Sequence, residues 1–599
     1  MIPRRSANST ASEPGSLGSP VAVIRPSTRS LLIPDGFPDP VTFGLPSTFT
    51  AWRPAQLDAI NRIMDSTKRF IVICAPTGMG KSLLAAGSGV LTGRRTVMLA
   101  STLGLADQNL RAFSSIARDI RGMANYRCNA ASSLAISPNT VVADAPCLSG
   151  YRCPMRSNGC DYFDAYRRAR QSPLITTTYQ CWMYDAMKDP GEALHVPDPI
   201  NPDNPNTPTV DMLICDEAAD AVEEIQRFVS VSLTCRECLH LHLDWPGDRK
   251  SASISIDDWR AWAVENAPDI RARVTRAEQS AKSGNGNGNG GAKELKALRE
   301  MLRKLDRLST IPRVHTGSHE QAIRDQWIMS PHLDPDTRSL DSIDFIPLDP
   351  SRYAESSLWR HVPRIILLSA TIRPKTADML GISPADMQFI EYPSTFPAAR
   401  RPIIVVPSVM LSHRTEQNDD VMLIWLRVID SIISGRLDRK GIVHATSYIR
   451  ARLLFDNSAH RSIMLIHNAG NRAQVIADFL SSPAPRVLVS PSITGGYDFH
   501  GDLARYAIIS KLPFQSVTDP VVKARQSIDP EYGLYLTSQE IIQSAGRVMR
   551  SEDDYGETFI VDDSFRNWFF QKTRKFYPEY WIDAIRWVEA VPPPLDLTK

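Results

Sequence analysis

The feature that most constrains the fold is a glycine-containing loop between an apolar run and a helical run. The apolar run is Phe70–Cys74, and Leu83-Leu84-Ala85-Ala86 follows a loop that reads Ala75-Pro76-Thr77-Gly78-Met79-Gly80-Lys81-Ser82. Glycines let backbone N–H groups approach phosphate oxygens, and the N-terminus of a helix adds positive potential. We therefore predict a nucleotide-binding loop, in which Lys81 reaches the β- and γ-phosphates and Ser82 ligates Mg2+. The alternative is a plain glycine-rich turn before a helix.

An acidic pair at the end of a second apolar run provides the other half of such a site. Asp216 and Glu217 end the run that starts at Asp211, about 135 residues after the loop. We expect Asp216 to hold Mg2+ through water and Glu217 to orient and deprotonate the attacking water. Taken alone, the pattern fits a capped strand end equally well.

Short β-branched runs alternate with helical patterns along most of the chain. Near-continuous apolar strands separated by helices indicate parallel sheets that are buried on both faces. We therefore predict an α/β fold built on parallel sheets. The expected strands are 70–74, 96–100, 212–215, 364–368, 441–443, 486–489 and 506–510.

Composition excludes several classes of protein. Among 599 residues, 68 Lys and Arg balance 66 Asp and Glu, so a polybasic binder is excluded, whereas an enzyme with a local basic groove is not. No apolar run approaches the ~20 residues that span a bilayer, and the first residues lack the apolar core of a secretory signal. Nine Cys are too few for a disulfide scaffold. We expect a cytoplasmic protein.

Five further motifs follow one another in a fixed order. They are Arg53-Pro-Ala-Gln56, Ser101-Thr102, Ser369-Ala370-Thr371, Thr494-Gly-Gly-Tyr-Asp498-Phe499 and Gln543-Ser-Ala-Gly-Arg547-Val-Met-Arg550. Each is uninformative alone, but their order resembles the motif series of superfamily 2 helicases. We expect the Gln56 amide to contact adenine beside Arg53. Arg547 and Arg550 lie on one face of a helix and would stabilise the γ-phosphate in the transition state; a solvated basic helix face is the alternative.

Four of the nine cysteines lie in one short window. Cys128, Cys147, Cys153 and Cys160 have the spacing C-x18-C-x5-C-x6-C. Four thiolates this close in an intracellular enzyme indicate a metal centre. Zinc sites usually contain close C-x2-4-C pairs, which this window lacks, whereas a four-thiolate set suits a 4Fe-4S cluster. Zinc and reduced structural thiols stay open as alternatives.

The segment that ends this window resembles the end of the iron–sulfur domain in XPD/DinG-type helicases. The matching residues are Cys153-Pro154, Gly159-Cys160-Asp161-Tyr162-Phe163 and Leu174–Tyr179, and Thr446-Ser447-Tyr448 and Lys511-Leu-Pro-Phe514 also look like family signatures. The resemblance covers roughly residues 48 to 565. It implies two RecA-like parallel-sheet domains, with an iron–sulfur insertion and a helical Arch-like insertion in the first.

The domain boundaries that we expect follow from this resemblance. The Arch-like insertion would be a helical hairpin over 256–308 whose tip is a Gly/Asn linker at 284–291. The full division is 1–46 disordered tail, 47–120 first part of motor domain 1, 121–172 iron–sulfur insertion, 173–225 continuation of motor domain 1, 226–345 Arch-like insertion, 346–376 end of motor domain 1 and 377–599 motor domain 2.

The resemblance implies an ATP-dependent DNA helicase that moves 5′ to 3′ on single-stranded DNA and unwinds forked duplexes, as a monomer in a bacterial or phage-infected cell. Its cofactors would be ATP, Mg2+ and a 4Fe-4S cluster. Gln543 would join Lys81 and the arginines in catalysis, and Asp498 would join the nucleotide contacts. Groups near Ser101, Thr102, Ser447 and Thr494 would contact DNA phosphates. A translocase that does not unwind DNA, or a DNA-binding redox sensor with a vestigial ATPase, is the alternative.

The chain also departs from the family pattern. The acidic box of the family usually reads Asp-Glu-Ala-His, but Ala219 stands in the place of the histidine, and Gly495 replaces a frequent Glu. We expect the missing imidazole to loosen the coupling between hydrolysis and strand binding without abolishing hydrolysis. A separate group, Cys235, Cys238, His240 and His242, fits either a zinc knuckle or an alternating strand pair.

Overall fold

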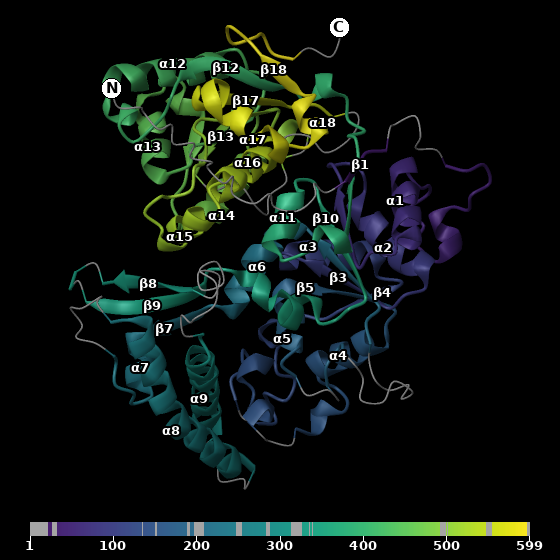
Figure 1. Cartoon of the computed structure of the whole chain (residues 1–599), viewed down its shortest axis with the longest axis vertical. Coiled ribbons are helices and arrows are strands. Elements are labelled where there is room, and N and C mark those ends of the chain that lie inside the picture. Colours follow the sequence, from purple (N-terminus) through teal and green to yellow (C-terminus); the bar gives the residue numbers. More distant parts are fainter. Residues whose placement is uncertain are drawn as a thin grey trace, which may run out of the picture.

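The structure is a computed structural model of the chain, viewed whole in Figure 1. It describes residues 22–26, 33–134, 136–149, 153–188, 192–196, 209–246, 254–282, 288–312, 326–334, 336–337, 339–491, 499, 501–546 and 554–595. Two parallel sheets form the core of the chain, and a small antiparallel sheet lies beside them. The predicted α/β class with two parallel-sheet domains is confirmed.

The first parallel-sheet domain, for which we keep the expected name motor domain 1, is built on an eight-stranded sheet in which every paired strand is parallel. Its spatial order is β1 (Val23–Ile24), β11 (Met387–Glu391), β2 (Phe70–Cys74), β10 (Arg364–Ser369), β6 (Met212–Asp216), β3 (Thr96–Ala100), β5 (Leu174–Thr178) and β4 (Ala117–Asp119).

Strand β2 shows why this sheet is buried on both faces. Successive side chains of a strand point to opposite faces. Ile71 and Ile73 enter a core formed with α1 (Pro54–Asp65) and α2 (Lys81–Thr92). Phe70 and Val72 enter the opposite core, together with residues of α4 (Asp161–Gln171), α5 (Tyr179–Asp185), α6 (Ala221–Val229) and α11 (Pro374–Met379). Helix α3 (Leu103–Phe113) follows β3.

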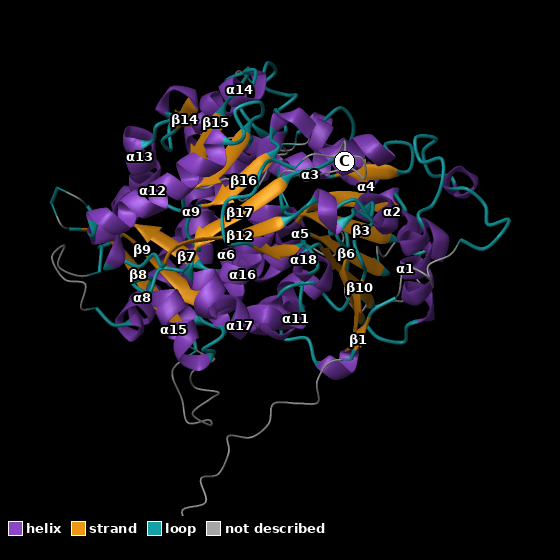
Figure 2. Cartoon of the chain, turned by 90° about the horizontal axis from the view of Figure 1, so that it is seen from above, coloured by secondary structure: helices purple, strands orange, loops and turns teal. Residues whose placement is uncertain are grey.

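The second parallel-sheet domain, for which we keep the expected name motor domain 2, has a seven-stranded parallel sheet, seen beside the first in Figure 2. Its order is β14 (Met464–Ile466), β15 (Val487–Ser490), β13 (Gly441–His444), β16 (Tyr506–Ile509), β17 (Glu557–Asp562), β12 (Ile403–Val409) and β18 (Ile585–Trp587). Its helices are α12 (Asp419–Ser434), α13 (Tyr448–Asn457), α14 (Arg472–Ser481), α15 (Pro520–Ile528), α16 (Tyr532–Ala545), α17 (Phe570–Thr573) and α18 (Glu579–Ile582).

A buried ion pair ties this second sheet to the end of the chain. Arg436 is fully buried and donates to both carboxylate oxygens of Glu557 in β17, at 2.8 and 2.7 Å. The same guanidinium lies 3.3 Å from the carbonyl oxygens of Pro592 and Pro593. A buried charge is tolerated when its hydrogen-bonding capacity is filled in this way.

The insertion between β6 and β10 is a helical hairpin on a small sheet. Helices α8 (Ile256–Lys282) and α9 (Gly288–Ser309) pack on the antiparallel strands β7 (Val231–Thr234), β9 (Leu340–Pro347) and β8 (Trp327–Leu333), as Figure 1 shows at the lower left. Trp259 is 1% exposed and joins the hairpin to the sheet, because its ring packs edge-on against Phe345 of β9.

The insertion that carries the cysteines is mostly irregular. Before α4 it consists of 3-10 turns, at Met123–Asn125, Val142–Asp144, Pro146–Ser149 and Pro154–Arg156. Backbone hydrogen bonds from Cys128 N to Thr140 O and from Val142 N to Tyr126 O hold its two sides together. Lys296 of α9 forms an ion pair with Asp144, so the hairpin contacts this insertion.

Three expectations about local structure are corrected. The tail before residue 47 is not wholly without structure: Val23 and Ile24 extend the sheet edge beside β11, and Arg25 pairs with Glu391 at 2.9 Å. Gly288–Gly291 belong to the first turn of α9, whereas 283–287, the rest of the predicted linker, fall outside the described residues.

The third correction concerns Cys235 and Cys238, which lie on a helix, α7 (Cys235–His240), and not on a strand. Thr234 caps this helix: its hydroxyl accepts from Glu237 N, and the Glu237 carboxylate accepts from Thr234 N, each at 3.1 Å. This reciprocal capping starts a helix at a position where the alternation of apolar residues favoured a strand. No described helix is long and apolar enough to cross a membrane.

Candidate functional site

The loop that we expect to bind phosphate connects β2 to α2. Gly78 and Gly80 have φ values of +87° and +80°, so both occupy the left-handed region that favours glycine. Lys81 and Ser82 are the first two residues of α2 and lie at its N-terminus, where backbone N–H groups are unpaired. This geometry suits an anion.

Side chains from two distant segments hold the loop. Gln56 is buried, and its amide nitrogen donates to Met79 O at 3.0 Å and to Gly80 O at 3.1 Å, while its oxygen accepts from Arg53 N. Both ends of the amide are therefore engaged within the protein. On the other side of the loop, a Cβ on Gly78 would lie 2.0 Å from the buried ring of Phe396.

The acidic pair lies one strand away from this loop. Asp216 ends β6, and β10 separates β6 from β2. The pKa of Asp216 is raised to about 6: burial is the main cause, the charge of Glu217 adds to the shift, and the Lys81 ammonium opposes both. Because β2 and β6 run parallel on either side of β10, their carboxyl ends bring the phosphate loop and the acidic pair to the same edge of the sheet. A divalent cation would favour the charged form of Asp216.

Ser369 connects the two halves of the site. It ends β10, and its carbonyl accepts from Ala75 N at 2.9 Å, at the start of the phosphate loop. Its hydroxyl donates to Glu217 Oε2 at 3.2 Å. Glu217 itself has φ +47°, a strained value for a residue with a side chain. Tyr179 OH donates to Asp216 O at 2.9 Å and holds the other end of the pair.

Asp220 follows the acidic pair and faces the loop that carries Ser101. Its pKa is raised to about 7: burial is the main cause, the charges of Glu217, Glu223 and Glu224 add to the shift, and a side-chain hydrogen bond with Ser101 opposes it. Asp220 belongs to none of the motifs that the sequence predicts. Its place one residue after Ala219 brings a carboxyl group near the position where the family has its histidine.

Two of the hydroxyls that we expect to contact DNA cap helices on different motor domains. Thr102 Oγ1 accepts from Leu105 N at 3.3 Å at the start of α3, and Ser447 Oγ accepts from Arg450 N at 3.2 Å at the start of α13. Helix N-termini attract phosphate groups. Gln543 lies in the last turn of α16, and Thr494, Asp498, Arg547 and Arg550 fall outside the described residues.

In the described structure, none of the four clustered cysteines forms a disulfide, and they lie in neighbouring segments. The pKa of Cys147 is raised to about 11: burial is the main cause, and the charges of Cys153, Cys128 and Cys160 add to the shift. The side chain of Asn129 donates to Asp161 Oδ2 and accepts from Asp161 N, both at 3.0 Å, so it joins the segments next to Cys128 and Cys160.

This donor set has the chemistry of an iron–sulfur site, since four thiolates are the ligands that such clusters take. In the described part of the chain, no three or more His, Cys, Asp or Glu side chains are arranged to hold a metal ion as they stand. Among the described residues, no such arrangement is formed by Cys235, Cys238, His240 and His242 either. Their geometry therefore does not favour a zinc knuckle.

Two family descriptions match the two motor domains. Residues 53–138 match "DEAD/DEAH box helicase", and residues 436–581 match "Helicase C-terminal domain". The first range contains the phosphate loop, and the second contains Ser447 and Gln543.

Among curated proteins, the chain is similar to the ATP-dependent DNA helicase DinG of Photobacterium profundum, with 25% identity over 260 residues, 40% of this chain and 36% of that protein. It is also similar to the ATP-dependent DNA helicase YoaA of Escherichia coli, with 27% identity over 194 residues, 31% of this chain and 30% of YoaA. The matched regions are thus about a third of the length of these relatives.

The fold extends the similarity to nearly the whole chain. The structure of S. tokodaii Xpd4 superposes with a TM-score of 0.55 at 13% identity, covering 90% of this chain and all of Xpd4. The chain is thus similar to DinG in sequence and to Xpd4 in fold. A second structure, of an XPD helicase, gives a TM-score of 0.54 at 14% identity over 89% of this chain. The resemblance inferred from the motifs is confirmed.

Proposed function

We propose that this XPD/DinG-like protein is an ATP-dependent DNA helicase. The observation that carries the proposal is the convergence of Lys81, Asp216, Glu217 and Ser369 at the ends of three adjacent parallel strands, β2, β6 and β10. A second parallel-sheet domain follows in the same chain. Such a pair of domains can turn nucleotide binding and hydrolysis into a movement of one against the other.

In this proposal each residue of the site has one task. Lys81 and the N-terminus of α2 bind the β- and γ-phosphates, and Ser82 and Asp216 hold Mg2+. Glu217 takes a proton from the attacking water, and Ser369 orients its carboxylate. Motor domain 2 contributes Gln543, Arg547 and Arg550, which would complete the site when the domains close.

The nucleic-acid track would run across both motor domains. The helix starts at Thr102 and Ser447 offer N–H groups and hydroxyls to phosphates of a single strand, which bind the backbone without reading sequence. We further propose 5′ to 3′ movement, a forked duplex substrate and a monomeric motor. We place it in the cytoplasm of a bacterial or phage-infected cell.

We also propose that Cys128, Cys147, Cys153 and Cys160 hold a 4Fe-4S cluster. When bound, the cluster would cross-link an insertion that has few regular elements of its own. The Asn129–Asp161 hydrogen bonds would keep the first and last cysteine segments in register before the cluster is inserted. No step of ATP hydrolysis depends on this group.

The test is an ATPase and strand-separation assay on anaerobically purified protein. We expect ATP hydrolysis that single-stranded DNA stimulates, and separation of a forked duplex with a 5′ tail. A Lys81→Ala variant should lose both activities. Stimulated hydrolysis without strand separation would favour a translocase, and wild-type hydrolysis that DNA does not stimulate would overturn the motor proposal.

A further inference from the structure

Helix α6 begins four residues after the catalytic Glu217 and leads away from the nucleotide site. It spans Ala221–Val229, and Ala221, Val222 and Ile225 are buried in the core beneath the sheet. At ~1.5 Å per residue, a helix of this length is on the order of 13 Å long. A movement of its C-terminal end would therefore be transmitted along the helix to its N-terminal end, next to the acidic pair.

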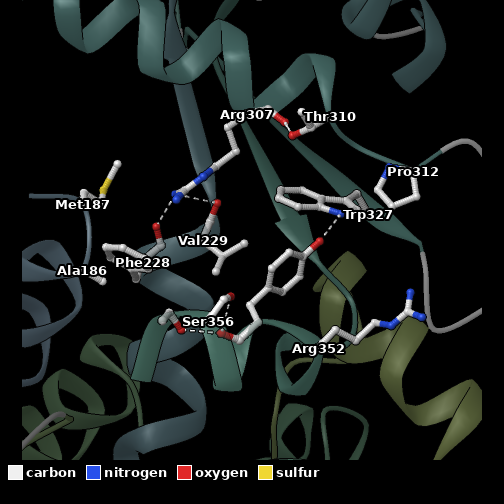
Figure 3. Close-up of a pocket in the computed structure, with 12 residues that line it drawn as sticks. Ala186, Met187, Phe228, Val229, Arg307, Thr310, Pro312, Trp327, Arg352 and Ser356 are labelled. Atoms are coloured by element: carbon white, nitrogen blue, oxygen red, sulfur yellow. Dashed lines mark hydrogen bonds between the residues drawn. The ribbon is translucent and has the colours of Figure 1, made fainter. Parts of the chain in front are cut away.

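An arginine from the Arch-like hairpin binds the C-terminal end of α6. Arg307 of α9 donates to Phe228 O and to Val229 O, the latter at 3.2 Å, and its guanidinium lies 5.2 Å from the centre of the Phe228 ring. Figure 3 shows this side chain reaching down from the hairpin to the end of α6, at the wall of a cavity of about 620 Å3. A cation there fills unpaired carbonyls and complements the helix dipole.

An arginine from motor domain 2 binds the same last turn of α6. Arg525 of α15 is 7% exposed, and its guanidinium donates to Gln226 Oε1 of α6 at 2.7 Å. It also donates to Leu348 O, at the base of the Arch-like insertion, at 3.0 Å, and to Tyr532 OH in its own domain at 2.6 Å. One buried side chain thus joins α6, the insertion and the second motor domain.

We propose that α6 is a coupling element, and that Arg307 and Arg525 are positioning residues that relay movement of the Arch-like hairpin and motor domain 2 to the acidic pair. The proposal rests on the function proposed above and names the regulation of that site. Neither arginine contacts the nucleotide loop in the described structure. A strand bound across the motor domains would shift α6 through these two contacts, and so set the position of Glu217.

Geometry favours relay over simple tethering. The two guanidiniums contact residues of a single helical turn, Gln226, Phe228 and Val229, but they come from elements that lie far apart in the chain. Arg525 is buried and Arg307 is partly buried. Hydrogen-bonded guanidiniums in such packed surroundings have few alternative positions, so a displacement of either one must move the helix or break the contact. Ala219 stands where we expect the family to have the imidazole that couples hydrolysis to strand binding. In this chain, α6 directly follows the turn at Ala218–Asp220 and so connects the acidic pair to both arginines.

The experiment compares Arg307→Ala, Arg525→Ala and the double variant, all in the full-length protein. Controls on the same two helices are Arg299→Ala, which removes an ion pair with Glu278 inside the hairpin, and Lys523→Ala, which changes an exposed side chain of α15. Hydrolysis is measured without DNA and at saturating single-stranded DNA, and thermal unfolding establishes that each variant folds.

We expect both single variants to keep wild-type hydrolysis without DNA and to lose about fivefold or more of the DNA-stimulated kcat, with the controls unchanged. The double variant should lose no more than the worse single variant, because both act through one helix. Arg525→Lys should restore part of the loss.

Folded variants that are stimulated like the wild type would overturn the relay, as would losses that multiply in the double variant. A wild-type protein that DNA does not stimulate would instead overturn the proposed function. The two failures are therefore distinguishable.

Discussion

The Ser369 hydroxyl lies 3.2 Å from the Glu217 carboxylate, although 152 residues separate them in the chain. The contact exists because β10 lies between the strands that carry the phosphate loop and the acidic pair. In a chain with Ala219 in the acidic box, this hydroxyl donates directly to the residue that we propose as the catalytic base.

We expect Ser369→Ala to lower the kcat for ATP hydrolysis by about threefold to tenfold, since a hydrogen bond to a charged group is worth about 1 kcal/mol or more. The KM for ATP should stay close to the wild-type value, because the phosphate loop is not altered. Steady-state kinetics at saturating DNA would measure both parameters. An unchanged kcat with a raised KM would contradict a role in orienting Glu217.

The cysteine assignment predicts that single substitutions deplete iron. Cys153→Ser should contain much less iron and sulfide than the wild type after anaerobic purification, because a three-thiolate site holds a cluster less well. Cys181→Ser is the matched control: this thiol lies in α5 outside the set, and its substitution should leave the iron content unchanged. Stoichiometric zinc in the wild type, with no iron, would refute the assignment.

The raised pKa of Asp220 predicts that the free energy of unfolding changes with pH in a specific way. Its pKa is raised to about 7, by burial first and then by the charges of Glu217, Glu223 and Glu224. The folded state therefore favours the neutral acid, and this stabilising contribution is fully present below about pH 4 and is lost as the pH rises through 7. Asp220→Asn stays neutral at every pH.

The melting temperature of Asp220→Asn minus that of the wild type should thus increase between pH 4 and 8. Thermal unfolding of both proteins across this range, in the absence of nucleotide, would measure the difference. A difference that stays constant with pH would show that Asp220 does not titrate in this window.

The Arg436–Glu557 pair predicts a large loss of stability when one partner is removed. In Arg436→Ala, Glu557 stays buried, at 1% exposure, without its counter-charge. The free energy of unfolding should fall by about 3–5 kcal/mol. Arg436→Met with Glu557→Leu removes both charges at similar volume and should recover most of that loss. Denaturant unfolding would compare the three proteins, and a single variant as stable as the wild type would contradict the prediction.

Local patterns predicted the parts of the fold that depend on neighbouring residues. The run Phe70–Cys74 and the loop that follows it could be placed on a strand and a helix start because apolar continuity and glycine positions are local properties. The helical hairpin over 256–308 also corresponds to elements of the structure, α8 and α9.

Contacts between distant segments could not be predicted in this way. Phe396 packs on Gly78 from more than 300 residues away, and the short strand at Val23–Ile24 is stable only because β11 offers an open edge. The Thr234–Glu237 cap overrode an alternation of apolar residues that favoured a strand. The amide of Gln56, which we expected to contact adenine, is shared between the phosphate loop and Arg53 N.

The position of β10 in the first sheet has a consequence for how the protein is made. Strands β2 and β6 carry the two halves of the nucleotide site, yet each pairs with β10, which the ribosome delivers only after both insertions. Nascent chains that end before residue 364 have a gap at the centre of this sheet. The part of the proposed nucleotide site that lies in motor domain 1 is therefore assembled only when more than half of the chain has been synthesised.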